Sequence, residues 1–308
     1  MFQLARHGAK VYLLARSKQR AQAAIERITS LDATLSKQIV FVQCDLADLE
    51  SVKAAAEEFT KREKKLHILL NNAGVMALPY GLTKQGLEMQ NGTNVVGHMV
   101  LSFLLLPTLT ATARSLPQGA RSVRIVQISS VGHVVPPLML QNQRWTSLEA
   151  VNRAWKPEVV GTWIRYGMSK TGNVLLASAL EKLTQNNGVR IANLSVHPGA
   201  VNTELQESVK SRMPMRGLID RIAATLLVTP QQGSLTQLYA ATSPEIDEKK
   251  LSGSYLVPTA QVGWKVGDAK DHDGARSAEL YTFVRDFVKE KVQVDLDQLV
   301  REAGLTQI

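Results

Sequence analysis

Cysteine is almost absent from this chain of 308 residues, which contains a single one, Cys44. One cysteine cannot form an internal disulfide framework, and it leaves a cysteine-based zinc cluster short of ligands. Aromatic residues contribute only 5% and charged residues 20%, whereas apolar residues reach 44%. This composition excludes a disordered chain, and it predicts a sizeable buried core and a reducing compartment.

Long apolar runs are also missing. The most apolar stretch, residues 99–106, covers about eight residues before Pro107, whereas a membrane-spanning helix needs about 20. Charged residues such as Arg6, Lys10 and Arg16 interrupt the amino-terminal region, which therefore lacks the pattern of a signal peptide. We expect a soluble, cytoplasmic protein without a transmembrane segment.

Acidic residues are in deficit, with 27 against 36 basic ones, which gives a net charge of +9 and a pI near 9.6. Such a surface favours anionic partners: a nucleotide cofactor, an acidic substrate, a membrane surface or nucleic acid. The densest basic run, residues 61–65, ends a predicted helix, where cations suit the helix dipole. Because no nucleic-acid-reading motif accompanies this charge, we do not expect a nucleic-acid partner.

Short apolar runs alternate with longer amphipathic stretches along the chain. The runs predict strands at residues 11–15, 39–42, 66–70, 123–128, 190–196 and 254–257. The amphipathic stretches predict helices at residues 19–31, 49–64, 87–111, 164–185, 230–242 and 275–289. This alternation indicates an α/β fold with a single Rossmann-like, doubly wound parallel sheet. No repeat or flexible linker marks a second domain, so we interpret residues 1–308 as one domain.

Two segments depart from the alternation. Residues 133–162 hold three prolines and two tryptophans and show no clean period. Long structured loops in α/β folds usually cover a site at the carboxyl edge of the sheet, so this segment is a candidate substrate lid. An ordinary packed excursion is the alternative. Residues 259–308 form a carboxyl-terminal extension that we expect to cap the pocket.

Tyr166 and Lys170 are four residues apart on a predicted helix, so their side chains lie one turn apart on one face. A tyrosine with a pKa near 10 is a poor acid–base group at neutral pH unless a cation stabilises its phenolate. A lysine one turn away supplies that cation. The spacing alone also fits an ordinary pair on a helix surface, so the surrounding motifs decide.

Those motifs follow the predicted strands in a fixed order. Residues 44–46 read CDL, residues 70–74 read LNNAG, and residues 125–130 read IVQISS, each at a strand end. Asn94 follows in TNVVGH inside a long helix, and residues 197–203 read HPGAVNT. Because the carboxyl ends of parallel strands share one edge of a sheet, we expect these groups to lie together.

Together these motifs resemble the short-chain dehydrogenase/reductase family, of the retinol-dehydrogenase-like or fungal oxidoreductase kind, from Leu4 to about Pro258. The resemblance implies a catalytic tetrad of four residues: Ser130, Tyr166, Lys170 and Asn94. It implies that Tyr166 exchanges a proton with the substrate oxygen while Ser130 hydrogen-bonds that oxygen. Lys170 would lower the pKa of the tyrosine and hold the nicotinamide ribose, and Asn94 would hold a water that links the lysine to solvent.

The same resemblance implies a set of cofactor-binding residues: Asp45, Leu46, Asn72, Ala73, Gly74, Tyr166, Lys170, Val201 and Thr203. Asp45 would accept a hydrogen bond from the adenine, although a turn cap is its alternative role. Small side chains in the NNAG run let the backbone approach the adenine ribose. Val201 and Thr203 would meet the carboxamide and the pyrophosphate.

Cofactor preference depends on the end of the strand at residues 11–15. An acidic residue there binds the ribose 2′-hydroxyl of NAD, and an arginine accommodates the 2′-phosphate of NADP. This chain has Arg16 and Ser17, and no acid occurs until Glu26. A planar guanidinium suits phosphate geometry, so NADP is expected in preference to NAD. Ordinary exposed surface cations are the alternative interpretation.

Other chemistries are not favoured. His133 and His197 lie near the expected site, but without an evident carboxylate partner they are expected to be structural or to line the substrate pocket. No His, Asp and Glu set has metal-ligand spacing. A hydrolase centred on Ser130 is not expected, because the G-x-S-x-G turn is absent.

One family feature is missing from the sequence. Chains of this family begin with a strand and a T-G-x-x-x-G-I-G turn, whereas residues 1–7 here are predicted to be the last turns of the following helix, with Gly8 as its stop. We therefore expect the first strand, the middle of a 3-2-1-4-5-6 sheet, to be lacking, which exposes two strand edges. An incomplete gene prediction, short by roughly 25 to 35 residues, and a genuine short form are the two explanations.

The sequence thus predicts an NADP-preferring oxidoreductase that transfers a hydride between the nicotinamide and a carbonyl or alcohol of a mostly apolar small molecule. A non-catalytic nucleotide-sensing or partner-binding protein on the same fold, or an inactive short form, is the alternative. A lipid-aldehyde enzyme at a membrane surface is a third. By family analogy, a homodimer would form through the helices at residues 87–111 and 164–185.

Overall fold

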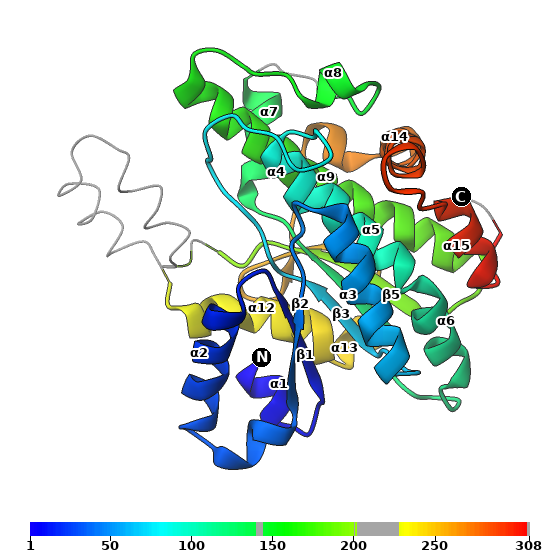
Figure 1. Cartoon of the computed structure of the whole chain (residues 1–308). Coiled ribbons are helices and arrows are strands. Elements are labelled where there is room, and N and C mark those ends of the chain that lie inside the picture. The colour runs from blue at the N-terminus through cyan, green and yellow to red at the C-terminus, as the bar shows by residue number, and fades with distance from the viewer. Residues whose placement is uncertain (140–143, 200, 202–227, 307–308) are drawn as a thin grey trace.

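The computed structural model describes residues 1–139, 144–199, 201 and 228–306. Its strands form two sheets (Figure 1). The smaller sheet pairs β1 (Val11–Ala15) with β2 (Ile39–Gln43) in parallel. The larger has the order β3-β4-β5-β6-β7, whose bounds are Ile68–Asn71, Val123–Ile128, Ile191–Val196, Tyr255–Val257 and Gln261–Val262. All neighbours in it are parallel except β7, which returns antiparallel to β6. The α/β fold predicted from the sequence is confirmed.

Burial differs between the two sheets. Every residue of β4 and β5 is buried, as expected for apolar strands that helices cover on both faces. Every residue of β1 is only half-buried. The deep core of the molecule therefore surrounds β4 and β5.

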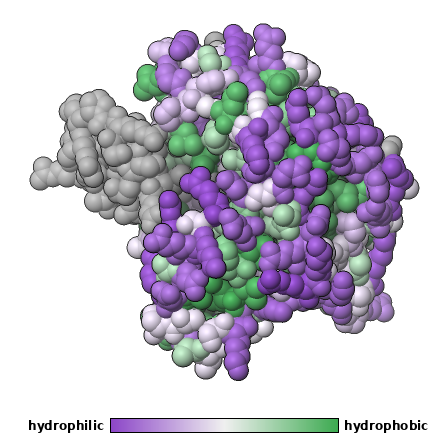
Figure 2. Space-filling model, in the orientation of Figure 1, coloured by the Kyte–Doolittle hydropathy of each residue, from purple (hydrophilic) through white to green (hydrophobic). Residues whose placement is uncertain are grey.

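The two sheets are separated at β1 and β3. Neither strand pairs with the other, so within the described ranges each keeps one edge without a ladder partner. The sequence led us to expect unpaired edges on these two strands, and both have one. Figure 2 shows apolar side chains at the surface in the area where Figure 1 places β1, α12 (Pro230–Thr242) and α13 (Glu245–Glu248).

The helices outside the site follow the predicted pattern closely, and side-chain caps fix where they begin. Ser17 caps α2 (Lys18–Thr29), and Asp48 caps α3 (Leu49–Arg62). Thr229 and Gln232 form a capping box at the start of α12. The remaining helices and 3₁₀ turns away from the site are α1 (Phe2–Arg6), η1 (Ala33–Lys37), η4 (Gly267–Lys270), α14 (Ala275–Val292) and α15 (Leu296–Glu302). Gly8 has a φ of +87°, the left-handed conformation that suits the residue after a helix end.

The single helix predicted at residues 87–111 is wrong. The chain instead forms α4 (Met89–Asn91), a π-helical turn η2 (Gly92–Val96), α5 (Gly97–Leu104) and α6 (Leu106–Ser115), with a bend of 51° at the break before α6. Pro107 explains the break, because proline has no N–H to continue a helix but is tolerated in a first turn. Such π-turns frequently occur at functional sites.

The helix predicted at residues 164–185 is longer than expected. α9 runs from Glu158 to Asn186. Its first turn is partly exposed and places the apolar Val159 at the surface, 68% exposed, so the apolar residues there do not mark a buried face and give no amphipathic signal. Residues 158–162, predicted to belong to the lid, are therefore the start of α9. The rest of that segment contains the end of η3 (Val131–Val134), α7 (Val135–Leu138) and α8 (Leu148–Val151).

Among the described residues, no single helix is both long and apolar enough to cross a membrane, and one bent pair, α4–α5 with α6, meets the length and composition criteria together. The same residues contain no group of three or more His, Cys, Asp or Glu side chains arranged to hold a metal ion.

Candidate active site

The carboxyl end of β4 delivers two serines to the site. Ser129 is buried, and its hydroxyl donates to the main-chain oxygen of Lys170 at 2.8 Å. Ser130 follows as the cap of η3, where its Oγ accepts a hydrogen bond from the Gly132 amide at 3.1 Å. The first contact ties the strand end to α9, and the second fixes the Ser130 hydroxyl beside that helix.

Tyr166 lies on α9 next to Ser130 and is 7% exposed. The Ser130 side chain is close enough to the phenol to act on its pKa, and Ser130 Oγ would lie 3.5 Å from a Cβ at Gly132. The ring packs so closely over Gly132 that a Cβ there would lie 2.9 Å from Cε1 of the tyrosine. Trp163, one turn earlier, meets the ring edge-on at 6.2 Å between centroids. Glycine at position 132 is therefore required for this placement of the phenol.

Lys170 lies one turn further along α9, and its ammonium is buried. Its Nζ donates to the main-chain oxygen of Ile128 at 2.9 Å and stands 5.6 Å from the centroid of the Tyr166 ring. A Cβ at Gly74 would lie 3.7 Å from this Nζ. Burial lowers the pKa of Lys170 to about 8.

The phenol of Tyr166 does not behave as the resemblance implied. Burial raises its pKa, and the neighbouring Ser130 side chain opposes that rise. Lys170 is directed at the Ile128 carbonyl and lies by the face of the ring. In this arrangement Tyr166 is protonated at neutral pH, and the expected lowering of its pKa is not found.

Asn94 lies in η2 and is fully buried. Its Oδ1 accepts from the Val75 amide at 2.8 Å, while its Nδ2 donates to the Val75 carbonyl and to Ser169 Oγ, each at 2.9 Å. Its main-chain oxygen bonds Nδ2 of Asn173 at 2.6 Å and Nδ1 of His98 at 2.9 Å. Asn94 therefore connects the loop after β3 to α9, and its link to solvent through a water stays a prediction.

The NNAG run lies beside these groups at the end of β3. Asn72 and Ala73 are exposed, and Gly74 is half-buried. A Cβ at Gly74 would come within 3.1 Å of Asn94 Oδ1, so glycine lets the chain pass this closely without displacing the Asn94 side chain. The predicted tetrad and the run thus surround one point at the carboxyl edge of the larger sheet.

The remaining predicted cofactor residues are dispersed. One oxygen of Asp45 accepts from the Ala47 amide at 3.0 Å, which is the turn-capping role given as its alternative. The main-chain oxygen of Leu46 would be 2.6 Å from a Cβ at Gly97, so this loop packs tightly against α5. Val201 forms an isolated bridge with Val228. Thr203 lies outside the described residues.

The end of β1 has the chemistry of an anion site. Arg16 is exposed, and within the described ranges no hydrogen bond or ion pair engages its guanidinium. Ser17 begins α2, where its Oγ accepts from the Arg20 amide at 3.3 Å. A free guanidinium, a hydroxyl and the amino end of a helix fit a phosphate group such as that of NADP. The glycine-rich turn that holds the pyrophosphate in this family does not occur in the sequence.

The two histidines near the site are held by burial. His133 bonds the Ser130 main-chain oxygen through Nδ1 at 2.8 Å and packs edge-on against Tyr255 at 4.9 Å between centroids. Burial lowers the pKa of His133, and burial with the nearby His133 lowers that of His197 to about 4. Both are neutral at pH 7, which fits the structural or pocket-lining role predicted for them.

Sequence reasoning missed a group of buried polar residues beside the tetrad. Its members on α9 are Arg165, Ser169 and Asn173, and its members before and within η2 are Glu88, Gln90 and Asn94. Only Asn94 was predicted. A signal was available, because polar residues at 165, 169 and 173 repeat every four positions, one residue ahead of Tyr166 and Lys170.

Comparisons with known proteins agree with this arrangement. The family model described as short chain dehydrogenase matches residues 1–141. A protein of Schizosaccharomyces pombe named as an uncharacterized oxidoreductase is 38% identical over 281 residues, covering 91% of this chain and 78% of the relative. Retinol dehydrogenase 11 of Mus musculus is 35% identical over 261 residues, covering 85% of this chain and 73% of that protein.

Solved structures share the fold. A crystal structure of a Mycobacterium paratuberculosis protein gives a TM-score of 0.64 at 28% identity, covering 94% of this chain and 87% of that one. A variant of actinorhodin polyketide ketoreductase crystallised with NADPH gives 0.60 at 18% identity, covering 84% and 89%. With oxidoreductase relatives aligned along most of its length and the Rossmann fold confirmed, the chain belongs to the short-chain dehydrogenase/reductase family.

Proposed function

We propose that this protein is an NADP-preferring oxidoreductase that transfers a hydride between the nicotinamide and a carbonyl or alcohol of a mostly apolar small molecule. The observation that carries the proposal is that three groups converge at one place. A Cβ at Gly132 would lie 2.9 Å from the Tyr166 ring and 3.5 Å from Ser130 Oγ, and the Lys170 ammonium stands 5.6 Å from the centroid of the tyrosine ring. All three groups belong to rigid elements around β4 and α9. Residues held in this way can manage one proton at a substrate oxygen.

The nicotinamide, when bound, supplies the hydride chemistry. Tyr166 holds the proton for the substrate oxygen, and its raised pKa supports the acid role, which is the one needed to reduce a carbonyl. Ser130 donates a hydrogen bond as negative charge develops on that oxygen. Lys170, with a pKa of about 8, holds the ribose hydroxyls and reprotonates Tyr166 after the tyrosine has given up its proton.

The preference for NADP rests on the end of β1. Arg16 and the Ser17 hydroxyl flank the amino end of α2, and Lys18 and Arg20 add positive charge nearby. These donors suit a 2′-phosphate and offer no carboxylate for a 2′-hydroxyl. NADPH is named with actinorhodin ketoreductase, a protein of the same fold, which is consistent with this preference.

An apolar substrate is supported by exposed apolar side chains on the elements that follow Ser130. Val131, next to Ser130, is 55% exposed, and Leu138 on α7 is 73% exposed. The relative from Mus musculus is named a retinol dehydrogenase, which supports the same substrate class. We propose homodimerisation through α5, α6 and α9, and a cytoplasmic location, on family analogy alone; size-exclusion chromatography tests the first.

The test is a titration of the purified chain with NADPH and NADH, followed by turnover of apolar aldehydes and ketones. NADPH is expected to bind more tightly, and Tyr166→Phe is expected to remove turnover while binding persists. Tyr281→Phe is the matched control, because Tyr281 is also buried and hydrogen-bonded, to Asp297. Undiminished turnover by Tyr166→Phe would contradict the mechanism.

A nucleotide-binding protein without turnover is the second candidate, and the division between β1 and β3 favours it. A cofactor that lies across both sheets would contact two strands, β1 and β3, that no ladder joins. Saturable NADPH binding with no turnover of any carbonyl or alcohol tested would select this candidate over the enzyme.

A further inference from the structure

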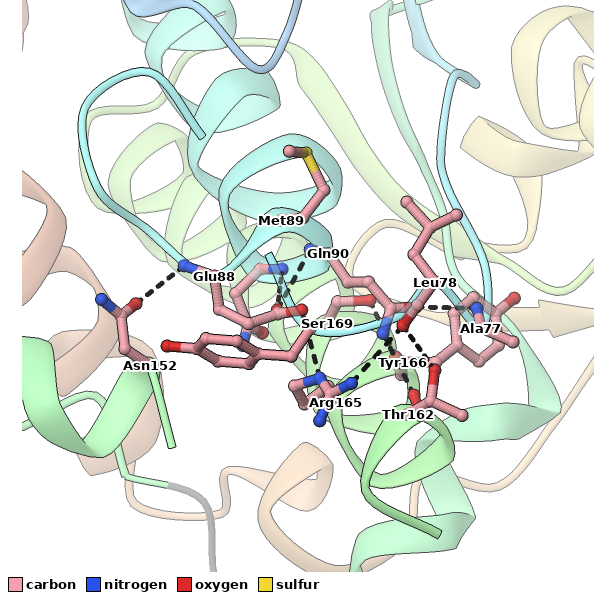
Figure 3. A network of polar contacts seen from close by, with 12 residues as sticks. Ala77, Leu78, Glu88, Met89, Gln90, Asn152, Thr162, Arg165, Tyr166 and Ser169 are labelled. Carbon is pink, nitrogen blue, oxygen red and sulfur yellow. Dashed lines mark hydrogen bonds and ion pairs between the residues drawn. The ribbon is translucent and has the colours of Figure 1, made fainter. Parts of the chain in front are cut away.

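A buried polar stripe runs along α9 beside the proposed acid. Arg165, Ser169 and Asn173 recur every four residues, so they lie one above another on a single face of the helix. The first two are fully buried and Asn173 is 1% exposed. This face meets the chain segment from Glu88 to Asn94, which leads into and forms most of η2. Figure 3 shows Arg165 and Ser169 from α9 facing Glu88 and Gln90.

Arg165 directly precedes Tyr166 and is held by two carboxylates. Its Nε lies 3.4 Å from Glu88 Oε1, an ion pair in which both side chains are fully buried. Its Nη2 pairs with Glu158 in the first turn of α9 and also donates to the Leu78 main-chain oxygen at 3.4 Å. Fully buried arginines are rare unless they are paired in this way.

Glu88 uses its other oxygen to begin a helix. Its Oε2 accepts from the amides of Gln90 at 3.0 Å and Asn91 at 2.9 Å, which caps α4. The same carboxylate therefore fixes the start of the segment that carries Asn94 and the turn of α9 that carries Tyr166. Gln90 adds a second tie, because its Nε2 donates to the Thr162 main-chain oxygen on α9 at 3.0 Å.

A second clamp lies one turn further along α9. Asn94 Nδ2 donates to Ser169 Oγ at 2.9 Å, and that hydroxyl donates to the main-chain oxygen of Tyr166 at 2.7 Å. Asn173 Nδ2 then meets the Asn94 main-chain oxygen. Tyr166 is therefore flanked by an ionic contact before it and a neutral contact after it, both made to the same segment.

We propose that Glu88 and Arg165 are positioning residues for Tyr166, which set the rotation of α9 that brings the phenol to Ser130. The inference rests on the proposed function of Tyr166 and deepens it. A helix can be held against its neighbour by apolar packing alone, but packing tolerates small rotations. A buried ion pair with fixed caps tolerates fewer, because any rotation separates the charges in a low dielectric.

The test removes both charges together, so that no unpaired buried charge is left to unfold the chain. In Glu88→Gln/Arg165→Met the glutamine still caps α4, and the methionine keeps most of the volume of the arginine. The matched control is Arg124→Met/Asp247→Asn, which removes the pair between Asp247 and the buried Arg124 at the opposite end of β4, 2.6 Å apart. Both variants are made in the full chain.

The expected result is a fall of about 10- to 100-fold in kcat for the Glu88→Gln/Arg165→Met variant, with KM values for NADPH and substrate changed less than about threefold. The control variant is expected to keep kcat within about twofold even where its melting temperature falls equally. Arg165→Lys, which keeps the charge opposite Glu88, is expected to recover part of the loss. Equal kcat in the two double variants would overturn the proposal.

A readout without turnover separates this proposal from the function on which it rests. The ¹³Cζ resonance of Tyr166, assigned by its absence in Tyr166→Phe, reports the surroundings of the phenol beside Ser130 at neutral pH. It is expected to move in Glu88→Gln/Arg165→Met and to stay unchanged in the control. An unmoved resonance overturns the positioning role. A third outcome is also decisive: if the resonance moves in the double variant but the wild-type protein turns over no substrate, the positioning role is supported and the proposed enzymatic function is overturned.

Discussion

The five-stranded half of the molecule and the two-stranded half differ in how firmly they are built. β4 and β5 are buried at every position, and Ser130, Tyr166 and Lys170 stand on or next to elements that pack on them. β1 is half-buried along its whole length and has β2 as its one ladder partner among the described strands. The groups proposed to move the proton thus lie in the firmer half.

The groups proposed to choose the cofactor lie in the other half. Arg16 and Ser17 follow β1, and Asp45 follows β2. Catalytic geometry can therefore persist while cofactor selection fluctuates, because local opening follows the local density of buried contacts. A ligand that touches both halves would stabilise mainly the weaker one.

Hydrogen exchange gives the largest expected difference. Amides of β1 and β2 are expected to exchange at least about 100-fold faster than those of β4 and β5, because among the described strands β1 and β2 pair only with each other. Saturating NADPH is expected to slow exchange mainly in β1 and β2. Mass spectrometry of quenched peptides measures both effects. Equal protection in the two sheets without cofactor would remove the distinction between the halves.

Substitution of Arg16 tests the selecting role of the two-stranded half. Arg16→Ala is expected to weaken NADPH binding by about 50-fold, since a charged hydrogen bond contributes about 1.5–3 kcal/mol. NADH binding is expected to change little, because NADH has no 2′-phosphate. Arg27→Ala, an exposed arginine in the last turn of α2, is the control. If Arg16→Ala weakened the binding of NADPH and NADH equally, Arg16 would have no role in selecting between the two cofactors.

The predictability of the fold from the sequence follows the same division. β4 and β5 could be located because their apolar runs are almost continuous. The start of α9 could not, since its first turn exposes the apolar Val159 and therefore lacks an amphipathic pattern. The break before α6 depended on Pro107, which also fits the first turn of a new helix.

Some features of the candidate site could be predicted from the sequence and others could not. The motif spacing predicted that Ser130, Tyr166 and Lys170 would meet, and the structure brings them together. The rise in the pKa of Tyr166 could not be predicted, because burial is a property of the folded chain. Nor could the pair between Glu88 and Arg165, whose members are far apart in the sequence and meet only when α9 packs against α4.

The buried charge of Lys170 tests the firmer half through stability. The folded pKa is lowered from 10.5 to about 8, so below pH 8 both states bind the proton and the penalty of burial is complete. Between pH 8 and 10.5 only the unfolded lysine stays charged, so stability rises with pH. The free energy of unfolding is expected to increase by about 2 kcal/mol from about pH 7.5 to 9.5.

Lys170→Met isolates this contribution from other titrating groups. The variant is expected to unfold with a flatter pH dependence over the same range and to be more stable than the wild type at neutral pH, since a methionine carries no charge to desolvate. Urea titrations at the two pH values measure both quantities. The lysine would not be buried as described if the free energy of unfolding of the wild type fell over this pH range and that of Lys170→Met fell by the same amount.

Gly132 gives the smallest expected effect and the finest test of the firmer half. A Cβ at this position would meet Cε1 of Tyr166 at 2.9 Å, so Gly132→Ala forces the ring to move by a few tenths of an ångström. We expect kcat to fall about fivefold with little change in melting temperature, because the shift affects the reacting phenol more than the core. Gly81→Ala, where the nearest atom is 4.0 Å away, is the control. If Gly132→Ala kept full activity, the five-stranded half would tolerate a displaced phenol, and its rigidity would not be what sets the rate.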